Sequence, residues 1–260
     1  MDLELTDKVA IVTGGAKGIG AAIVRALVRE GATPIVIDRD EAAARELQHD
    51  VAAPGRRVEI VVADLTDVSQ CRRAVGDALG RTGRLDAVVN NAGVNDRVGL
   101  EAGSPAAFLE SIGRNLVHVY AITHHALPAL KQSRGAIVNI ASKVAMTGQG
   151  GTSGYAAAKG GILALTREWA VELLPAGIRV NAVVPAEVMT PLYRQWLGTF
   201  PDPDRAQAEI VARIPLGHRM TTPDEIAATV VFLLSARASH TTGQQVVVDG
   251  GYTHLDRAVR

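Results

Sequence analysis

The chain has 260 residues, of which 47% are hydrophobic and 21% are charged, the composition of a globular protein. Its 27 Lys and Arg residues balance its 27 Asp and Glu residues, which leaves no basic surplus to bind nucleic acid or an anionic membrane. The N-terminal stretch lacks a signal peptide's apolar run, and no segment reaches the roughly 18 apolar residues of a membrane span. The single cysteine, Cys71, suits a reducing compartment, so we expect a cytoplasmic protein.

Strand-like and helix-like segments alternate along the chain. The expected strands cover residues 8–14, 33–38, 57–65, 85–93, 135–142, 178–184 and 244–250. Helices are expected over residues 19–31, 41–52, 69–83 and 223–235, and two longer ones flank the fifth strand. Continuous Val and Ile runs that alternate with helices predict a doubly wound, parallel α/β sheet with helices on both faces. We expect one domain over residues 1–260, with an irregular lid insertion at about 186–222.

The first strand and helix are joined by the glycine-rich stretch TGGAKGIG, residues 13–20. Gly14 permits a tight turn, Gly18 lets the backbone approach a pyrophosphate, and Gly20 lets the helix pack on the strand. The free N–H groups of the helix would then face the phosphates. The alternative is a plain glycine turn, but the strand–turn–helix context favours a dinucleotide site.

Charged residues near this turn bear on the choice of cofactor. Asp38 ends the second strand, where an acid can bind both ribose hydroxyls of NAD and repel the 2′-phosphate of NADP. Lys17 and Arg39 can bind that phosphate, although Arg39 can equally be a solvated surface charge. These signals predict use of both cofactors, with NADP favoured. Asp64, after the third strand, can contact adenine or be an exposed loop acid.

Candidate catalytic residues lie in the second half of the chain. Tyr155 and Lys159 are four residues apart on an expected helix and therefore share one face. Ser142 ends the fifth strand, at the edge where open parallel sheets bind ligands. Asn115 lies in a helical pattern further upstream. Each of these residues alone has an ordinary structural explanation.

Together, these features resemble the short-chain dehydrogenase/reductase family over nearly the whole chain. The matching motifs are TGGAKGIG, Asp64, NNAG at 90–93, Asn115, Ser142, YAAAK at 155–159 and VDGG at 248–251. The resemblance implies a Rossmann-type domain of about seven strands, usually in a homotetramer whose long helices pair between subunits. It also implies a catalytic tetrad of Asn115, Ser142, Tyr155 and Lys159.

The same resemblance implies the cofactor site. Its residues would be Gly14, Lys17, Gly18, Ile19, Gly20, Asp38, Arg39, Asp64, Leu65, Asn91, Ala92, Gly93, Tyr155, Lys159, Pro185, Val188 and Thr190. One departure is visible: where the family usually has Pro-Gly, this chain has Pro185-Ala186, followed by Glu187. That change bears on how the backbone passes the nicotinamide, and it leaves the tetrad intact. No metal is expected.

The tetrad has a physical rationale. Tyrosine has a pKa of about 10, too high for a base at neutral pH. The Lys159 ammonium and the positive nicotinamide ring both favour phenolate, so we expect the pKa of Tyr155 to fall. Tyr155 then takes the alcohol proton while hydride moves to the nicotinamide, and Ser142 holds the substrate oxygen. By resemblance, Lys159 also binds the nicotinamide ribose, and Asn115 anchors a water path.

Substrate contacts are expected around the stretch VPAEVMTPLYRQW, residues 184–196, which combines a carboxylate with aromatic side chains. The predicted substrate residues are Asn95, Arg97, Ser142, Lys143, Gln149, Tyr155, Glu187, Tyr193 and Trp196. Aromatic faces suit sugar C–H surfaces, and Glu187 can accept hydrogen bonds from hydroxyls. The alternative is that Tyr193 and Trp196 only pack a lid helix onto the core.

Residues 184–197 and 142–161 also resemble the L-fucose dehydrogenases of bacterial sugar breakdown. This resemblance implies oxidation of the anomeric hydroxyl of β-L-fucopyranose to a lactone, with L-galactose and D-arabinose as further substrates. A ketone or 3-oxoacyl-carrier reductase that uses NADPH is the main alternative, because it would run the same tetrad in reverse. A non-catalytic nucleotide sensor is disfavoured, since it would not need Ser142, Tyr155 and Lys159 together.

Overall fold

The computed structural model describes residues 1–255 and contains one parallel sheet of seven strands, which confirms the expected fold class. The strands are β1 (Val9–Thr13), β2 (Thr33–Asp38), β3 (Glu59–Val62), β4 (Ala87–Asn90), β5 (Ala136–Ile140), β6 (Arg179–Pro185) and β7 (Gln245–Val248). They pair in the order β3-β2-β1-β4-β5-β6-β7, and each pair is parallel.

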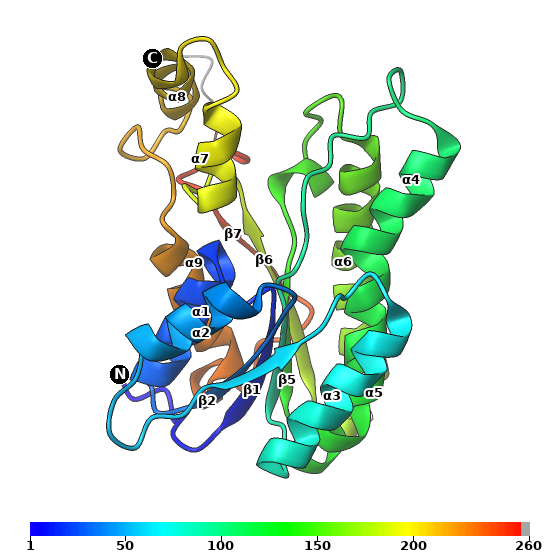
Figure 1. Ribbon diagram of the computed structural model, residues 1–260, viewed down its shortest axis with the longest axis vertical. Helices are drawn as coiled ribbons and strands as arrows, with labels where there is room; N and C mark the ends of the chain where they lie inside the picture. Colours follow the sequence, from blue (N-terminus) through cyan, green and yellow to red (C-terminus); the bar gives the residue numbers. More distant parts are fainter. Residues whose placement is uncertain (256–260) are drawn as a thin grey trace.

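Helices occupy both faces of this sheet (Figure 1). They are α1 (Gly18–Arg29), α2 (Glu41–Asp50), α3 (Val68–Thr82), α4 (Pro105–Ile112), α5 (His118–Ser133), α6 (Ser153–Glu172), α7 (Pro191–Leu197), α8 (Pro203–Val211) and α9 (Pro223–Leu234). A π-helical turn, η1 (Gly113–Val117), joins α4 to α5. Short 3-10 turns are η2 (Lys143–Ala145), η3 (Leu174–Ala176) and η4 (Ala236–Ala238).

Two apolar layers hold the helices on the sheet. Successive strand residues point to opposite faces, so Val12 joins the layer under α1 and α9 while Ile11 joins the layer under α3, α5 and α6. Both side chains are fully buried. Burial on both faces explains the continuous Val and Ile runs that predicted a doubly wound sheet.

The strand order reverses between β1 and β4, which sit side by side although β2 and β3 intervene in the sequence. Loops after the carboxyl ends of these two strands diverge to opposite faces, and open α/β sheets bind ligands at such a point. The glycine-rich turn follows β1, and residues 91–93 follow β4. The fold therefore brings the two motifs to one edge of the sheet.

The lid segment, residues 186–222, is more regular than the sequence analysis expected. It contains α7 and α8, which stand above the carboxyl ends of β6 and β7 (Figure 1). Each helix follows a capping side chain and a proline: Thr190 accepts from the N–H of Tyr193, and Asp202 accepts from that of Arg205. An N-cap followed by proline was therefore a readable start signal. Leu197, Ile214 and Met220 give the segment a small core of its own.

Among residues 1–255, no helix combines the length and apolar composition that crossing a membrane would require.

Candidate active site

The glycine-rich turn after β1 forms a backbone cradle. Gly14 and Gly18 have φ values of 60° and 55°, a conformation that favours glycine. A Cβ on Gly20 would lie 2.0 Å from the carbonyl oxygen of Gly14, so only glycine lets α1 pack this closely. Lys17, the residue before α1, makes no side-chain cap, which leaves the first N–H groups of the helix available. These features fit the pyrophosphate of a dinucleotide.

Residues 91–93 fasten this cradle to β4. The side chain of Asn91 donates to the carbonyl oxygens of Thr13 and Gly14, each at 3.0 Å. The Thr13 hydroxyl accepts from the backbone N–H groups of Asn91 and Ala92 at 3.0 and 3.1 Å. A Cβ on Gly14 would lie 2.9 Å from the Cα of Ala92. Hydrogen bonds and close packing by Asn91 and Ala92 thus hold the backbone of the glycine-rich turn in place.

Asp38 sits at the end of β2, beside the same turn. Its carboxylate accepts from the N–H of Ala16 and of Asp40, both at 3.0 Å. The ammonium of Lys17 pairs with Asp40 at 2.6 Å, which raises the pKa of Lys17 and lowers that of Asp40. One of the two cations that favoured NADP is therefore already paired, while Arg39 is exposed. The sequence analysis had not considered Asp40.

Three further predicted cofactor residues lie around this edge. The Asp64 carboxylate accepts from the N–H and hydroxyl of Thr66 at 2.9 and 2.8 Å, and these bonds lower its pKa. Leu65 and Ile19 are partly buried and pack against the two apolar layers. These hydrogen bonds hold Asp64 in a local turn. Its contact with adenine stays a prediction.

The predicted catalytic pair, Tyr155 and Lys159, lies on α6 near the carboxyl end of β5. The Lys159 ammonium is 2% exposed, donates to the Ile140 carbonyl at 2.7 Å, and lies 5.6 Å from the centroid of the Tyr155 ring. Ser142 follows β5 and its side chain hydrogen-bonds that of Tyr155. The structure thus brings three of the four predicted catalytic side chains together.

Burial controls the protonation of this pair. It raises the pKa of Tyr155 to about 12 and lowers that of Lys159 to about 8. Ser142 opposes the first shift, and the Asp96 carboxylate adds to it. The lowering of the Tyr155 pKa that Lys159 and the nicotinamide ring are expected to cause together stays a prediction, since in the protein alone burial raises this pKa. Asp96, which the sequence analysis missed, is partly buried and accepts from the Ser111 hydroxyl at 2.8 Å.

Asn115 is fully buried in the π-helical turn η1. Its side chain donates to the carbonyl of Ser111 at 3.1 Å and accepts from the N–H of Val94 at 2.7 Å. A Cβ on Gly93 would lie 3.0 Å from the Asn115 oxygen and 3.4 Å from the Lys159 nitrogen. Glycine at 93 thus lets Asn115 and Lys159 approach the same spot, which completes the predicted tetrad spatially.

Four further side chains form what we call the lid cluster: Lys143, Glu187, Tyr193 and Tyr252. Glu187 pairs with the Lys143 ammonium and accepts from the Tyr193 hydroxyl at 2.7 Å. The same ammonium lies 4.1 Å from the centroid of the Tyr252 ring. Burial and the Glu187 carboxylate together raise the pKa of Tyr193. Tyr252 was missed because it lies far along the chain, although it directly follows VDGG.

Trp196 and Arg97 lie at the outer rim of this cluster. Trp196 packs edge-to-face against Tyr193 and Phe200, each with ring centroids 5.0 Å apart. The Arg97 guanidinium lies 5.4 Å above the Trp196 ring. The aromatic rings therefore pack against one another, and the Tyr193 hydroxyl donates to Glu187.

Two predicted substrate residues are not part of this arrangement. Asn95 accepts from the N–H of Arg97 at 3.2 Å in a local turn. Gln149 is exposed in the loop before α6, and no interaction joins it to another residue of the described chain.

The base of the lid lies beside the glycine-rich turn. Val188 is buried and bridges to Thr221, and its carbonyl accepts from the N–H of Thr190 at 2.8 Å. The Thr190 methyl would lie 3.3 Å from a Cβ on Gly18. Pro185 ends β6 in register with Val248. The predicted residues Pro185, Val188 and Thr190 therefore lie where lid and cofactor cradle meet.

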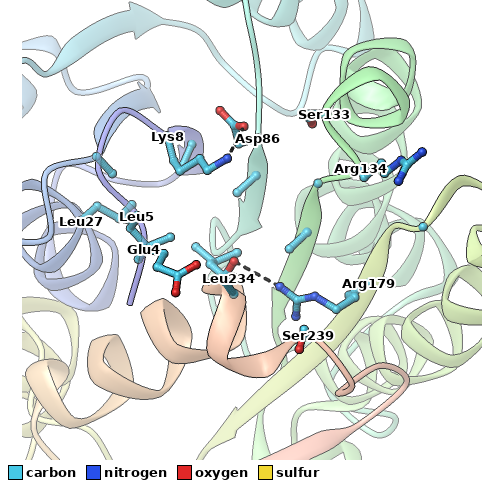
Figure 2. Close-up of a pocket in the computed structure, with 17 residues that line it drawn as sticks. Glu4, Leu5, Lys8, Leu27, Asp86, Ser133, Arg134, Arg179, Leu234 and Ser239 are labelled. Atoms are coloured by element: carbon cyan, nitrogen blue, oxygen red, sulfur yellow. Dashed lines mark hydrogen bonds and ion pairs between the residues drawn. The ribbon is translucent and has the colours of Figure 1, made fainter. Parts of the chain in front are cut away.

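A cavity of about 310 Å³ opens at the opposite, amino-terminal edge of the sheet (Figure 2). Several of its charges are engaged in structural contacts: Lys8 lies 3.5 Å from Asp86, and Arg179 donates to the carbonyls of Leu233 and Leu234 that end α9. In Figure 2, Arg179 points at Leu234 rather than into the hollow. Neither Tyr155 nor Lys159, whose pKa values burial shifts, lines this cavity. Within residues 1–255, no group of His, Cys, Asp and Glu side chains is arranged to bind a metal.

Comparisons with known proteins agree with this geometry. A family model described as enoyl-(acyl carrier protein) reductase matches residues 14–253. The chain is 39% identical over 252 residues to an L-fucose dehydrogenase of Bos taurus, covering 96% of this chain and 91% of that protein. It is 35% identical over 250 residues to a 3-oxoacyl-[acyl-carrier-protein] reductase, FabG, of Thermotoga maritima, covering 96% and 99%. The crystal structure of Cj0485 dehydrogenase superposes with a TM-score of 0.94 at 45% identity, covering 100% and 99%.

Proposed function

This chain belongs to the short-chain dehydrogenase/reductase family and is an NAD(P)-dependent oxidoreductase, and from that premise we propose that it oxidises the anomeric hydroxyl of a sugar. The proposed substrate is β-L-fucopyranose and the product its 1,5-lactone, with L-galactose and D-arabinose as further substrates. The similarity to a curated L-fucose dehydrogenase supports this choice. Fold alone does not, because the family architecture serves many substrates.

The lid cluster is the observation that carries the sugar proposal. It combines a carboxylate acceptor, Glu187, with an ammonium donor, Lys143, and a phenol donor, Tyr193. Neighbouring sugar hydroxyls each donate and accept, so these three groups can exchange their mutual contacts for contacts to a polyol. The ring of Tyr252 offers an apolar face for sugar C–H groups. An acyl-chain substrate would leave the buried pair of Lys143 and Glu187 without use.

The chemistry follows from the catalytic side chains. When bound, the nicotinamide supplies a two-electron hydride acceptor and a positive charge. Ser142 and Tyr155 hold the C1 oxygen by hydrogen bonds. As the C1–H bond breaks and its electron pair leaves with the hydride, the O–H proton passes to the Tyr155 oxygen and C1–O becomes a carbonyl. Lys159 stabilises the phenolate and is positioned to bind the nicotinamide ribose.

The cofactor proposal follows the charges beside the turn. The glycine cradle fits the pyrophosphate, which NAD and NADP share, so it does not distinguish the two cofactors. A Cβ at Gly20 would close the cradle to both. Asp38 favours NAD, and the pairing of Lys17 with Asp40 weakens the attraction for a 2′-phosphate. We therefore propose that both cofactors bind and that the preference for NADP is smaller than the sequence alone suggested.

A spectrophotometric screen of sugars with NAD and NADP tests the function. L-Fucose, L-galactose and D-arabinose should be oxidised and D-glucose should not, with the Tyr155→Phe variant as an inactive control. No turnover of any of the three sugars by the wild type would refute the substrate proposal.

The rival function is reduction of a 3-oxoacyl carrier substrate with NADPH. The family model's description and the Thermotoga maritima relative favour it. Acetoacetyl thioester reduction without any sugar oxidation would establish this alternative.

We also propose that the enzyme is a homotetramer in the cytoplasm. The helical face made by α4, η1, α5 and α6 exposes large apolar side chains, with Leu109 and Val171 each 69% and Tyr120 55% exposed. Burial of such a face between copies would be favourable. The free thiol of Cys71 is buried, and burial raises its pKa to about 11. A single free thiol without a disulfide partner is compatible with a reducing compartment. Light scattering that gives the mass of one chain would refute the tetramer.

A further inference from the structure

The carboxylate of Asp96 lies close to the proposed catalytic residues, and the catalytic scheme above gives it no role. Its side chain is 10% exposed. One oxygen, Oδ1, accepts from the Ser111 hydroxyl at 2.8 Å, whereas the buried Oδ2 makes no hydrogen bond to a residue of the described chain. A buried, charged oxygen without a hydrogen-bond partner costs free energy, so its position needs a physical reason.

The loop that carries Asp96 is hydrogen-bonded to the turn that carries Asn115. The N–H of Val94 donates to the Asn115 side-chain oxygen at 2.7 Å, and the Asn115 side-chain nitrogen donates to the Ser111 carbonyl at 3.1 Å. The hydroxyl of the same serine donates to Asp96. These three hydrogen bonds link the loop to α4 and η1, so the Asp96 carboxylate has a fixed place next to one member of the predicted tetrad.

The same loop contacts the start of α6, next to Tyr155. The Val98 carbonyl accepts from the N–H of Gly154 at 3.0 Å. A Cβ on Gly154 would lie 2.5 Å from the Ser111 hydroxyl oxygen, so glycine before Tyr155 lets α6 pack this closely. Ser111 therefore contacts both Asp96 and the residue that precedes Tyr155. The negative charge of Asp96 acts on Tyr155 and adds to burial in raising the pKa of its hydroxyl.

Charged groups surround this pair from three elements. On α6, the Lys159 ammonium lies 5.6 Å from the centroid of the Tyr155 ring. In η1, the Arg114 guanidinium lies 3.8 Å from Asp96 Oδ2 and also pairs with Glu110 on α4. Arg114 thus partly compensates the Asp96 charge from the side that is exposed to solvent.

Two further ionisable groups on neighbouring elements contribute little charge of their own. Lys143 in η2 is paired with Glu187. Burial, and then the charge of Lys159, lower the pKa of His118 on α5 to about 4, so this imidazole is neutral at physiological pH. Asp96 is therefore the unbalanced negative charge that acts on Tyr155.

This charge has a consequence for the proposed base. A phenolate at Tyr155 would be repelled by the Asp96 carboxylate, and such repulsion is strong in a site with little water. Asp96 therefore favours the protonated tyrosine as long as no further positive charge is near. The repulsion is offset by the positive ring of an oxidised nicotinamide and not by the neutral ring of the reduced form.

We propose that Asp96 is a positioning residue that makes the base form of Tyr155 depend on the positive charge of the bound, oxidised cofactor, and that Arg114 weakens this effect. Tyrosine then loses its proton when the cofactor can accept a hydride and keeps it otherwise. The inference rests on the proposed role of Tyr155 as proton acceptor, and it does not depend on which alcohol is the substrate.

A spectroscopic test follows Tyr155 by NMR in protein labelled with carbon-13 at the tyrosine Cζ, with Tyr155→Phe to assign the signal. Without cofactor or with NADH, Tyr155 should stay protonated up to about pH 10, and NAD should lower its titration midpoint. Asp96→Asn keeps an acceptor for the Ser111 hydroxyl but removes the charge, so the midpoint with NAD should fall by about 0.5–1 pH unit. Glu101→Gln, an exposed carboxylate further along the same loop, should leave it unchanged.

A kinetic test uses whichever alcohol the wild type oxidises. At saturating cofactor, the acid limb of the kcat/KM profile reports the protonation of the base. Asp96→Asn should move this limb to lower pH by the same amount as the NMR midpoint. Arg114→Met removes the compensating cation and should move it to higher pH by a smaller amount. A purely structural role of Asp96 would lower kcat/KM at every pH without moving the limb.

An equal Tyr155 midpoint in the wild type and Asp96→Asn would overturn the proposal, and so would equal ionisation with NAD and NADH. Arg114 is 41% exposed, so Arg114→Met provides a result even if Asp96→Asn does not fold, and a limb that stays in place or moves to lower pH contradicts the proposal. Expected titrations without oxidation of any sugar would refute only the proposed substrate.

Discussion

The proposed catalytic side chains and the lid cluster are held in different ways. Lys159 donates a hydrogen bond to the backbone carbonyl of Ile140, and the Asn115 side chain hydrogen-bonds the backbone of Ser111 and Val94. In the lid cluster, side chains such as Lys143 and Glu187 hold each other. A hydrogen bond to a backbone group is kept when the residue that carries this group is substituted. A hydrogen bond to a side chain is lost when that side chain is replaced. The first arrangement suits a reaction shared by a family, and the second suits a specificity that changes among its members.

Electrostatics separates the two regions as well. The catalytic pair is desolvated without a compensating charge, which shifts the pKa of Lys159 down to about 8 and that of Tyr155 up to about 12. The charges of Lys143 and Glu187 compensate each other at a similar depth, with side chains 9% and 14% exposed. Shifted pKa values of this kind are typical of catalytic groups, and mutual charge pairing is typical of a binding surface. The following predictions test that contrast.

The largest effect is expected at Tyr155. Tyr155→Phe removes the hydroxyl that receives the proton, so kcat should fall by about 10²- to 10⁴-fold. Cofactor dissociation constants, measured by fluorescence titration, should stay unchanged. Tyr120→Phe, on the exposed helical face, is the matched control and should keep full turnover. Near-normal turnover in Tyr155→Phe would remove this residue from the chemistry.

Lys159→Met tests the uncompensated charge. The Lys159 pKa is about 8 in the folded protein against an ordinary 10.5, so between these values the unfolded chain binds more protons. Wild-type stability should therefore rise with pH from 8 to 10.5, relative to Lys159→Met, by about 3 kcal/mol. Urea denaturation at several pH values measures this difference. Lys131→Met, exposed on α5, should show no such trend, and a flat difference for Lys159→Met would contradict the desolvation argument.

Glu187→Gln tests whether the lid cluster binds the sugar. The variant keeps the shape but loses the charge that orders Lys143 and Tyr193, so KM for the sugar should rise about ten-fold. Because Glu187 is remote from proton transfer, kcat should change by less than about three-fold. Glu209→Gln, exposed on α8, serves as control. An unchanged KM would mean that Glu187 does not bind the sugar.

Asp40→Asn should have the smallest effect. It releases Lys17 from its exposed ion pair, so NADP should bind about two- to five-fold more tightly relative to NAD. Titration of both cofactors gives the ratio, and Glu41→Gln, next in sequence, controls for the lost charge. A ratio that moves toward NAD would show that Lys17 does not face the 2′-phosphate.

Some features missed in the sequence had readable signals. The starts of α7 and α8 are marked by Thr190-Pro191 and Asp202-Pro203, a capping residue followed by proline. The pairing of Lys17 with Asp40 was not readable, because it joins residues 23 apart across a turn. The same holds for Tyr252, which meets Lys143 from the other end of the chain.

The sequence by itself determined the doubly wound sheet, the glycine cradle and the family tetrad. Those features depend on periodic burial and on backbone conformations that only particular residues adopt, such as Gly14 and Gly18 at positive φ. The tertiary structure decided which charges meet and which lose their water. It showed that burial raises the pKa of Tyr155 to about 12, and that the Glu187 carboxylate pairs with the Lys143 ammonium. Desolvation and side-chain pairing depend on distances between segments far apart in the chain, which a linear pattern does not contain.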